Sequence, residues 1–320
     1  MTGAVDASGA SRPVGGIAAV VVAAAVWGTT GTATHFAPGV PAFVFGAVTF
    51  GLGGLVLAGL AGRGTLRAVV ARGTRGWVWL GAVALAVYAV AFYAALADAG
   101  VALGTTIAIG SSPVFAGLVE WVAERRPVAR RWVLATVVSV VGMVVVTLAR
   151  STSSSSGSLA IGLGAALLAG LTYALYSWAI ARGMGSFRAA VPGGPTAEIV
   201  SRARPNGRGL VGAVFGLAAV PLVVLAVVSG HEYLAVPSDW PVFLYLALVP
   251  TVIGHSLYAV GLRTVTASAA TLLSLFEPVV AAVLAVLVVG EHLGVVGWGG
   301  IVLVVLGLAL LAVPGRASRR

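Results

Sequence analysis

The chain has 320 residues, of which 59% are hydrophobic and 9% are charged, and its mean hydropathy is +1.06. A soluble domain carries charge on about a quarter of its residues, so this composition indicates a protein that crosses the membrane several times. The sequence contains no cysteine, which excludes disulfides, zinc thiolate sites and iron–sulfur clusters. All 19 basic residues are arginines, and the formal net charge is +10.

Apolar runs long enough to cross a bilayer recur along the whole chain. A hydrocarbon core about 30 Å thick requires roughly 20 apolar residues in a helix. The prolines of the segment 37–41 separate the first two runs. The first run is longer than the apolar part of a signal peptide, so we expect it to remain in the mature protein. The sequence predicts an all-α membrane protein with ten transmembrane helices, at 14–36, 40–61, 76–97, 101–123, 128–149, 158–181, 209–229, 240–262, 266–289 and 294–313.

The arginines predict the orientation of these helices. With the N-terminus inside, 18 of the 19 arginines lie in cytoplasmic segments, and only Arg150 lies outside. This distribution follows the positive-inside rule, so we expect both termini in the cytoplasm and the protein in the plasma or inner membrane. Topology and anionic lipid at the inner surface explain the basic charge, so membrane lipid is an expected partner and nucleic acid is not.

Polar segments divide the chain into two halves. Residues 1–13 and 314–320 are expected to be cytoplasmic tails, and 150–157 an outer linker rich in serine. Residues 183–208 are rich in Gly, Pro and Arg and predict a disordered cytoplasmic loop. That loop is either a plain linker or a binding segment.

The two halves, 14–149 and 158–313, are copies of one unit. Residues 92–116 align with 257–281 without a gap at an offset of 165, which pairs Tyr93 with Tyr258 and Pro113 with Pro278. Each copy holds five helices, and five is odd, so the copies must face opposite ways across the membrane. Such inverted repeats are typical of secondary transporters, whose binding site lies between the copies.

Short motifs recur along the two copies: Trp27-Gly28, Tyr93, Ser112-Pro113, Glu124-Arg125 and Gly142, then Tyr258, Glu277-Pro278, Gly290-Glu291 and Gly307. Together they resemble the motifs of the EamA family of the drug/metabolite transporter superfamily. The similarity covers residues 14–313. It implies a ten-helix inner-membrane carrier, often an exporter of amino acids or other metabolites, with a central cavity. One departure is that Arg126, not Glu124, aligns with Glu291.

Prolines lie inside two matching helices. Pro113 and Pro278 each remove one backbone N–H and are expected to kink their helices, freeing the carbonyls of Ile109 and Ser274. In a membrane such breaks persist only against protein or a wet cavity. We expect both kinks to line the substrate pathway, and the alternative is a kink made by packing alone.

Aromatic and hydroxyl side chains at depth are candidates for binding substrate. Trp27 and Thr30 lie in the first helix, and Tyr173 occupies the matching part of the sixth. The threonine could instead bond its own backbone. Tyr93 and Tyr258 form a matched pair, for which anchoring at the membrane interface is the alternative.

Glu277 is the most unusual residue of the apolar segments. The helical rise puts it about 15 Å deep, near the midplane, where a charge costs roughly 2.5 kcal/mol or more. We expect it to bind a cationic substrate group or a coupling proton, with His255 as its partner. The alternative is a protonated Glu277 that caps free backbone near Pro278. Glu120 is expected to reach water or pair with Arg125.

The sequence holds no enzyme motif, no cofactor or metal motif and no ATP-binding loop, so transport would use a secondary gradient. We therefore expect a secondary transporter of small organic metabolites, amino acids or drug-like solutes, that works as an exporter by alternating access. The alternative is a membrane scaffold or sensor without transport. Dense glycines in the second and tenth helices suit close contact within one chain or between two.

Cysteine labelling tests the orientation. Because the chain has no cysteine of its own, Ser151→Cys and Gly194→Cys each report a single position. We expect an impermeant thiol reagent added to whole cells to label Ser151→Cys, and Gly194→Cys to react only after the membrane is opened. The reverse pattern would contradict the predicted topology.

Overall fold

The computed structural model describes residues 11–125, 128–150, 158–189, 207–290, 292 and 294–312, and every element within these segments is helical. The elements, in order, are α1 (Ser11–Gly28), α2 (Thr30–Thr34), α3 (Ala42–Ala61), α4 (Arg63–Val70), α5 (Arg75–Ala99), α6 (Val101–Glu124), α7 (Arg130–Arg150), α8 (Leu159–Ala189), α10 (Gly207–Ser229), α11 (His231–Leu234), η1 (Pro237–Asp239), α12 (Trp240–Leu246), η2 (Ala247–Gly254), α13 (His255–Gly261), α14 (Ala267–Leu273), α15 (Phe276–Leu284), η3 (Ala285–Val289) and α16 (Val295–Ala312).

The described segments contain nine helical stretches long and apolar enough to cross a membrane, and a tenth, shorter apolar helix at Val295–Leu311. They match the ten expected spans in order, which confirms the all-α membrane fold. Three of the spans are interrupted: the first is divided into α1 and α2, the eighth contains η1 and η2, and the ninth is divided into α14, α15 and η3.

The predicted loop at 183–208 was wrong at both ends. Helix α8 continues to Ala189, and α10 already begins at Gly207. The extension is stabilised by packing: a Cβ atom at Gly183 would lie 2.8 Å from the Leu210 side chain, and Met184 is 7% exposed. Residues 190–206 of the predicted loop and 151–157 of the predicted outer linker lie outside the described residues.

The sequence did not predict α4, a short helix in the basic segment between α3 and α5. Its Ala68 is fully buried, and a Cβ atom at Gly209 of α10 would lie 2.6 Å from the Gly64 carbonyl oxygen. Eight residues with two arginines give too short an apolar pattern to recognise.

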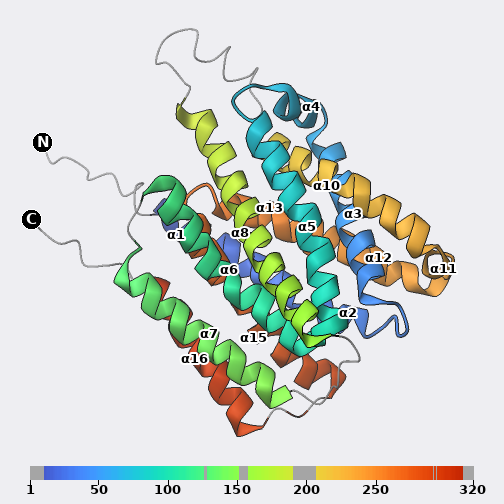
Figure 1. Cartoon of the computed structure of the whole chain (residues 1–320), viewed down its shortest axis with the longest axis vertical. Coiled ribbons are helices and arrows are strands. Elements are labelled where there is room, and N and C mark those ends of the chain that lie inside the picture. Colours follow the sequence, from blue (N-terminus) through green and yellow to red (C-terminus); the bar gives the residue numbers. More distant parts are fainter. Residues whose placement is uncertain are drawn as a thin grey trace, which may run out of the picture.

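The helices form one bundle with two outer pairs. Figure 1 shows α7 and α16 side by side at one edge and α3 and α10 at the opposite edge, with α5 and α8 between them. Helix α5 packs along α8, and α1 packs on α13 and α15. The largest buried cluster joins these inner helices to α10 and includes Trp27, Tyr173, Tyr176 and Tyr258.

Contacts between α7 and α16 reproduce the repeat in three dimensions. A Cβ atom at Gly142 would lie 2.7 Å from the carbonyl oxygen of Gly300, and one at Gly307 would lie 2.8 Å from that of Ala135. Moving each residue to its counterpart in the other copy converts one contact into the other. Between them the Ser139 hydroxyl donates to the Val304 carbonyl oxygen at 3.5 Å, a pair separated by the repeat offset of 165. A pseudo-twofold axis therefore passes between these two residues.

The pair α3 and α10 obeys the same symmetry. A Cβ atom at Gly51 would lie 3.0 Å from Val223, and one at Gly216 would lie 2.7 Å from Ala58. These contacts again exchange when each residue moves by the repeat offset. In both pairs residue numbers rise along one helix as they fall along the other, so counterpart helices run antiparallel. The two five-helix copies are therefore inverted, as the sequence predicts.

Glu120 joins the two copies. Its Oε1 accepts from the Ser268 backbone N–H at 3.0 Å, and its Oε2 accepts from the Ser268 hydroxyl at 2.6 Å. Of the two expected partners, water and Arg125, neither accounts for these bonds, because the start of α14 offers Glu120 two donors. The neighbouring Glu124 accepts from the Trp178 indole at 2.9 Å and lies 3.5 Å from the Arg182 guanidinium. These bonds bind the end of α6 to α14 and α8.

Adjacent glycines of α16 provide a matched test of the α7–α16 contact. A Cβ atom at Gly300 would lie 2.7 Å from the Gly142 carbonyl oxygen, whereas one at Gly299 has no neighbour within 4 Å. We expect Gly300→Ala to lower the free energy of unfolding by about 1–3 kcal/mol, because backbone atoms must move apart. Gly299→Ala should leave it unchanged or slightly raised. Equal melting temperatures for the two variants in detergent would contradict the described contact.

Candidate functional site

Three interrupted helices lie next to one another in the bundle. The first span is interrupted at Thr29, the ninth at residues 274–275, and the eighth contains the π-helix η2. Irregular backbone survives at membrane depth only where protein or a water-filled cavity satisfies it. π-Helical turns are frequent at functional sites, and discontinuous helices mark the binding sites of many transporters. This region is therefore the strongest candidate for a site.

The dipeptide Trp27-Gly28 is where the three helices touch. The Trp27 indole N–H donates to the Pro250 carbonyl oxygen in η2 at 3.0 Å. A Cβ atom at Gly28 would lie 2.7 Å from the Glu277 carbonyl oxygen and 2.6 Å from Val280. Glycine is needed here because any side chain would push α15 away from α1.

The carbonyls that Pro278 and Pro113 leave without a helical partner are satisfied locally. The Ser274 carbonyl oxygen, four residues before Pro278, accepts from the backbone N–H of Glu277 at 3.0 Å. The Ile109 carbonyl oxygen, four residues before Pro113, accepts from the Ser112 hydroxyl at 2.8 Å. Helix α6 stays continuous through Pro113, whereas the ninth span is interrupted just before Pro278.

A third proline, Pro250, was not singled out from the sequence. It lies within η2, and the Leu246 carbonyl oxygen that it frees accepts from the Thr251 hydroxyl at 3.3 Å. The sequence could have indicated Pro250, because it is a proline within a long apolar run. The comparison of the two copies did not point to it, because its counterpart in the first copy is not a proline.

Four of the predicted residues come together in one aromatic cluster. The Trp27 ring lies 4.8 Å from the His255 ring and 5.2 Å from the Tyr258 ring, and Tyr173 lies 6.3 Å from Tyr258. Tyr258 is 1% exposed, and its hydroxyl donates to the Ser177 hydroxyl at 3.0 Å. The alternative of interface anchoring therefore does not fit Tyr258, which lies in the core.

His255 is enclosed by aromatic rings. Its Nδ1 lies 3.1 Å from the Thr251 carbonyl oxygen, and its ring lies 4.7 Å from Phe215 and 5.7 Å from Phe50. Among the described residues, His255 and Glu277 share no hydrogen bond or ion pair. The expected pairing of these two residues is thus absent, because His255 is occupied by the aromatic cluster and its own helix.

The tyrosines of α5 are polar groups within electrostatic range of Glu277. Its side chain is half-buried, and its charge would act on Tyr88 and Tyr93. The Tyr93 ring occupies the space where a side chain at Gly46 would lie, so the glycine of α3 fixes its position. Two tyrosines of α5 thus lie within electrostatic range of the carboxylate that the sequence singled out.

Tyr88 connects the carboxylate to the aromatic cluster, and sequence analysis missed it. Its ring lies 5.5 Å from Tyr173 and 6.1 Å from Phe50, and it is within electrostatic range of Glu277. The sequence could have indicated Tyr88, because it is a tyrosine in the apolar middle of a predicted helix, five residues before Tyr93. Its position has no tyrosine counterpart in the second copy, so the repeat did not single it out.

Three more polar side chains, two threonines and a tyrosine, lie in this region. Thr30 is half-buried in α2, just after the interruption of the first span. The hydroxyl of the neighbouring Thr29 donates to the Val26 carbonyl oxygen at 2.6 Å and accepts from the Tyr245 hydroxyl at 2.8 Å. The Tyr176 hydroxyl is buried in the aromatic cluster with no hydrogen-bond partner among the described residues. Buried polar groups without a partner are rare, so this hydroxyl is available to a ligand or a water molecule.

Comparisons with known proteins agree with this architecture. A model of the EamA-like transporter family matches residues 14–148 and 200–313. The "Uncharacterized transporter YwfM" of Bacillus subtilis (strain 168) is 32% identical over 307 residues, which cover 94% of this chain and 94% of that protein. A solved crystal structure aligns with a TM-score of 0.73 at 21% identity and covers 95% of this chain and 96% of its own, which shows a shared fold.

Two tryptophans allow a test of the contact between α1 and η2. Trp27→Phe removes a donor from a buried carbonyl, so we expect it to lower the free energy of unfolding by about 1–3 kcal/mol. Trp240→Phe makes the same chemical change at an exposed bond to the Leu234 carbonyl oxygen, where water replaces the donor, so its effect should be smaller. Thermal unfolding in detergent measures both. An equal or larger loss in Trp240→Phe would contradict the structural role of Trp27.

Proposed function

Because the chain belongs to the EamA-like transporter family, we propose that it exports small organic solutes across the cell membrane by alternating access, driven by a secondary gradient. Its termini would lie in the cytoplasm, in line with the distribution of arginines. Family membership and the similarity to a named transporter favour transport over the scaffold or sensor role.

The observation that carries the proposal is the meeting of three interrupted helices at Trp27-Gly28. They belong to both inverted copies, so a change in the relative position of the copies alters this point first. In inverted-repeat transporters the two copies rock around a central site built from discontinuous helices. We therefore place the substrate between the aromatic cluster and Glu277, and the domains 14–149 and 158–313 are the units that would move.

The chemistry of the site fits a substrate with an amino group, such as an amino acid or an amine-bearing drug-like solute. The carboxylate of Glu277 would attract an ammonium group, and the tyrosine hydroxyls of α5 would accept hydrogen bonds from its N–H groups. Aromatic faces attract cations, with about 0.5–2 kcal/mol for each good contact. The proposed binding residues are those predicted from the sequence, Trp27, Thr30, Tyr93, Tyr173, His255, Tyr258 and Glu277, together with Tyr88 and Tyr176.

Glu277 would also couple transport to protons. A bare carboxylate near the midplane is costly, so the side chain should hold either a cationic substrate or a proton. Exchange of one for the other keeps the site neutral and makes the carrier a proton antiporter. The alternative role of Glu277, capping free backbone near Pro278, is already performed by its own N–H on the Ser274 carbonyl oxygen. That leaves the side chain available for coupling.

Transport by Glu277→Gln tests both parts of the proposal. Comparing metabolites inside and outside cells with and without the protein identifies the exported solute. Export of that solute should fall at least tenfold in Glu277→Gln, and the residual rate should lose the pH dependence of the wild type. The matched control is Glu232→Gln, which changes an exposed carboxylate of α11 and should export normally.

The amount of folded protein in the membrane must be equal in all three strains. If Glu277→Gln keeps both the wild-type rate and its pH dependence, Glu277 carries no coupling. If no solute differs between cells with and without the protein, the export function itself is contradicted.

A further inference from the structure

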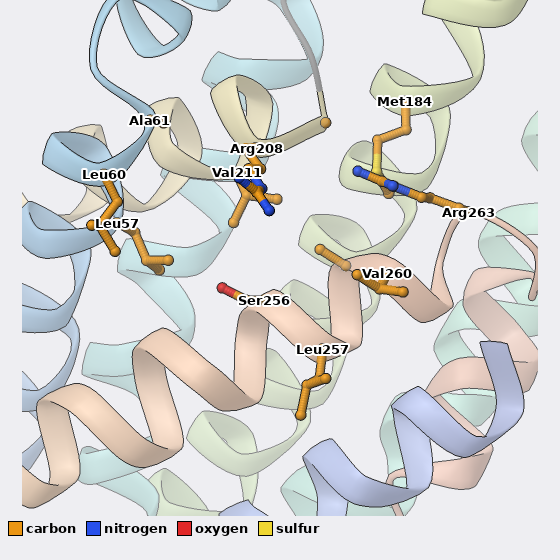
Figure 2. A pocket seen from close by; sticks show the side chains of 12 residues that line it. Leu57, Leu60, Ala61, Met184, Arg208, Val211, Ser256, Leu257, Val260 and Arg263 are labelled. Carbon is orange, nitrogen blue, oxygen red and sulfur yellow. The ribbon is translucent and has the colours of Figure 1, made fainter. Parts of the chain in front are cut away.

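A second site lies away from the aromatic cluster, in a pocket of about 410 Å³ between the ends of α3 and α8, the start of α10, and α13. Figure 2 shows Arg208 and Arg263 on one side of this pocket and Ser256 and Val260 of α13 on the other. It is a mixed pocket, with two cationic side chains above an otherwise largely apolar lining.

The two arginines have no counter-charge in the described part of the chain. Neither forms an ion pair or a hydrogen bond with another described residue, and no acidic residue lines the pocket. The Arg263 guanidinium lies against Gly207, the residue before Arg208, and both arginines line the pocket. The N-terminal end of α10 adds partial positive charge there. An anion in this pocket would be attracted by both arginines, which are exposed.

The rest of the pocket is shaped for an apolar chain. Leu60 of α3 is 74% exposed and Val260 of α13 is 46% exposed, and Leu257 lies one turn away on the same helix. Ile253, at 49% exposure, continues the same helical face seven residues before Val260. In a membrane these exposed apolar side chains face lipid. A small soluble anion would use the arginines and leave this surface without a partner.

We propose that this pocket binds an anionic phospholipid. The phosphate lies between the guanidinium groups of Arg208 and Arg263, the Ser256 hydroxyl donates to a headgroup oxygen, and one acyl chain follows Leu60 and Val260. Guanidinium groups bind phosphate through paired hydrogen bonds, and basic pockets between membrane helices bind anionic headgroups. This inference does not depend on the direction or substrate of transport.

Lipid-dependent melting of the purified protein in detergent tests the site. Phosphatidylglycerol should raise the melting temperature of the wild type, and phosphatidylcholine, which has the same chains and no net charge, should raise it much less. Arg208→Gln and Arg263→Gln should each weaken the phosphatidylglycerol response about fivefold, as expected for about 1 kcal/mol per arginine at an anionic headgroup. The double variant should lose the response. The control is Arg72→Gln, an exposed arginine outside the pocket, which should respond like the wild type.

Native mass spectrometry of the wild type gives a measurement that needs no variant. Phosphatidylglycerol should stay bound in preference to phosphatidylcholine at equal concentration. Equal retention of both lipids, or a full melting response in the double variant, would overturn the proposal. If inorganic phosphate alone reproduces the melting response, the pocket is a site for soluble anions and the lipid assignment is wrong.

Discussion

The close contact of α1 with α15 and η2 is the constraint on which the rest of the site depends. Gly28 brings the Glu277 carbonyl against α1, and the adjacent Trp27 satisfies the Pro250 carbonyl in η2. Without this contact the interrupted backbone of the eighth and ninth spans would lack part of its support within the membrane. The same contact brings the aromatic cluster and the half-buried carboxylate close to each other, so structural support and the proposed chemistry use the same few residues.

Periodicity and charge predicted the fold well because the bilayer imposes them. A span must be about 20 apolar residues long, and arginines must stay on one side, so ten segments and their inversion follow from the sequence. The contacts of Gly142 with Gly300 and of Gly307 with Ala135 then arise from the repeat itself. The prediction failed where packing between helices determines the end or the existence of a helix. Helix α8 continues past Gly183 because Leu210 covers that residue. Helix α4 forms because it packs on α10 and buries Ala68.

The candidate site was predicted only in part for a similar reason. Trp27, Tyr173, His255 and Tyr258 were recognisable because large polar-tipped or ionisable side chains are unusual at depth, and the structure brings all four together. Pairing between helices has no local signature. The sequence therefore could not assign the tyrosines of α5 to Glu277, or Ser268 to Glu120, since each partner lies far along the chain.

The bond between Glu120 and Ser268 breaks the symmetry of the two copies. Their counterparts under the repeat are Ala285 and Leu103, which cannot form a carboxylate-to-serine bond. If the two copies were identical, the conformations open to either side of the membrane would be related by the twofold axis. They would then have equal free energy and equal populations. Here one end of the bundle is held by two charge-assisted bonds that the opposite end cannot replace. Under the proposed exchange, these two bonds would favour the conformation described here, and any movement that separates α6 from α14 would have to break them.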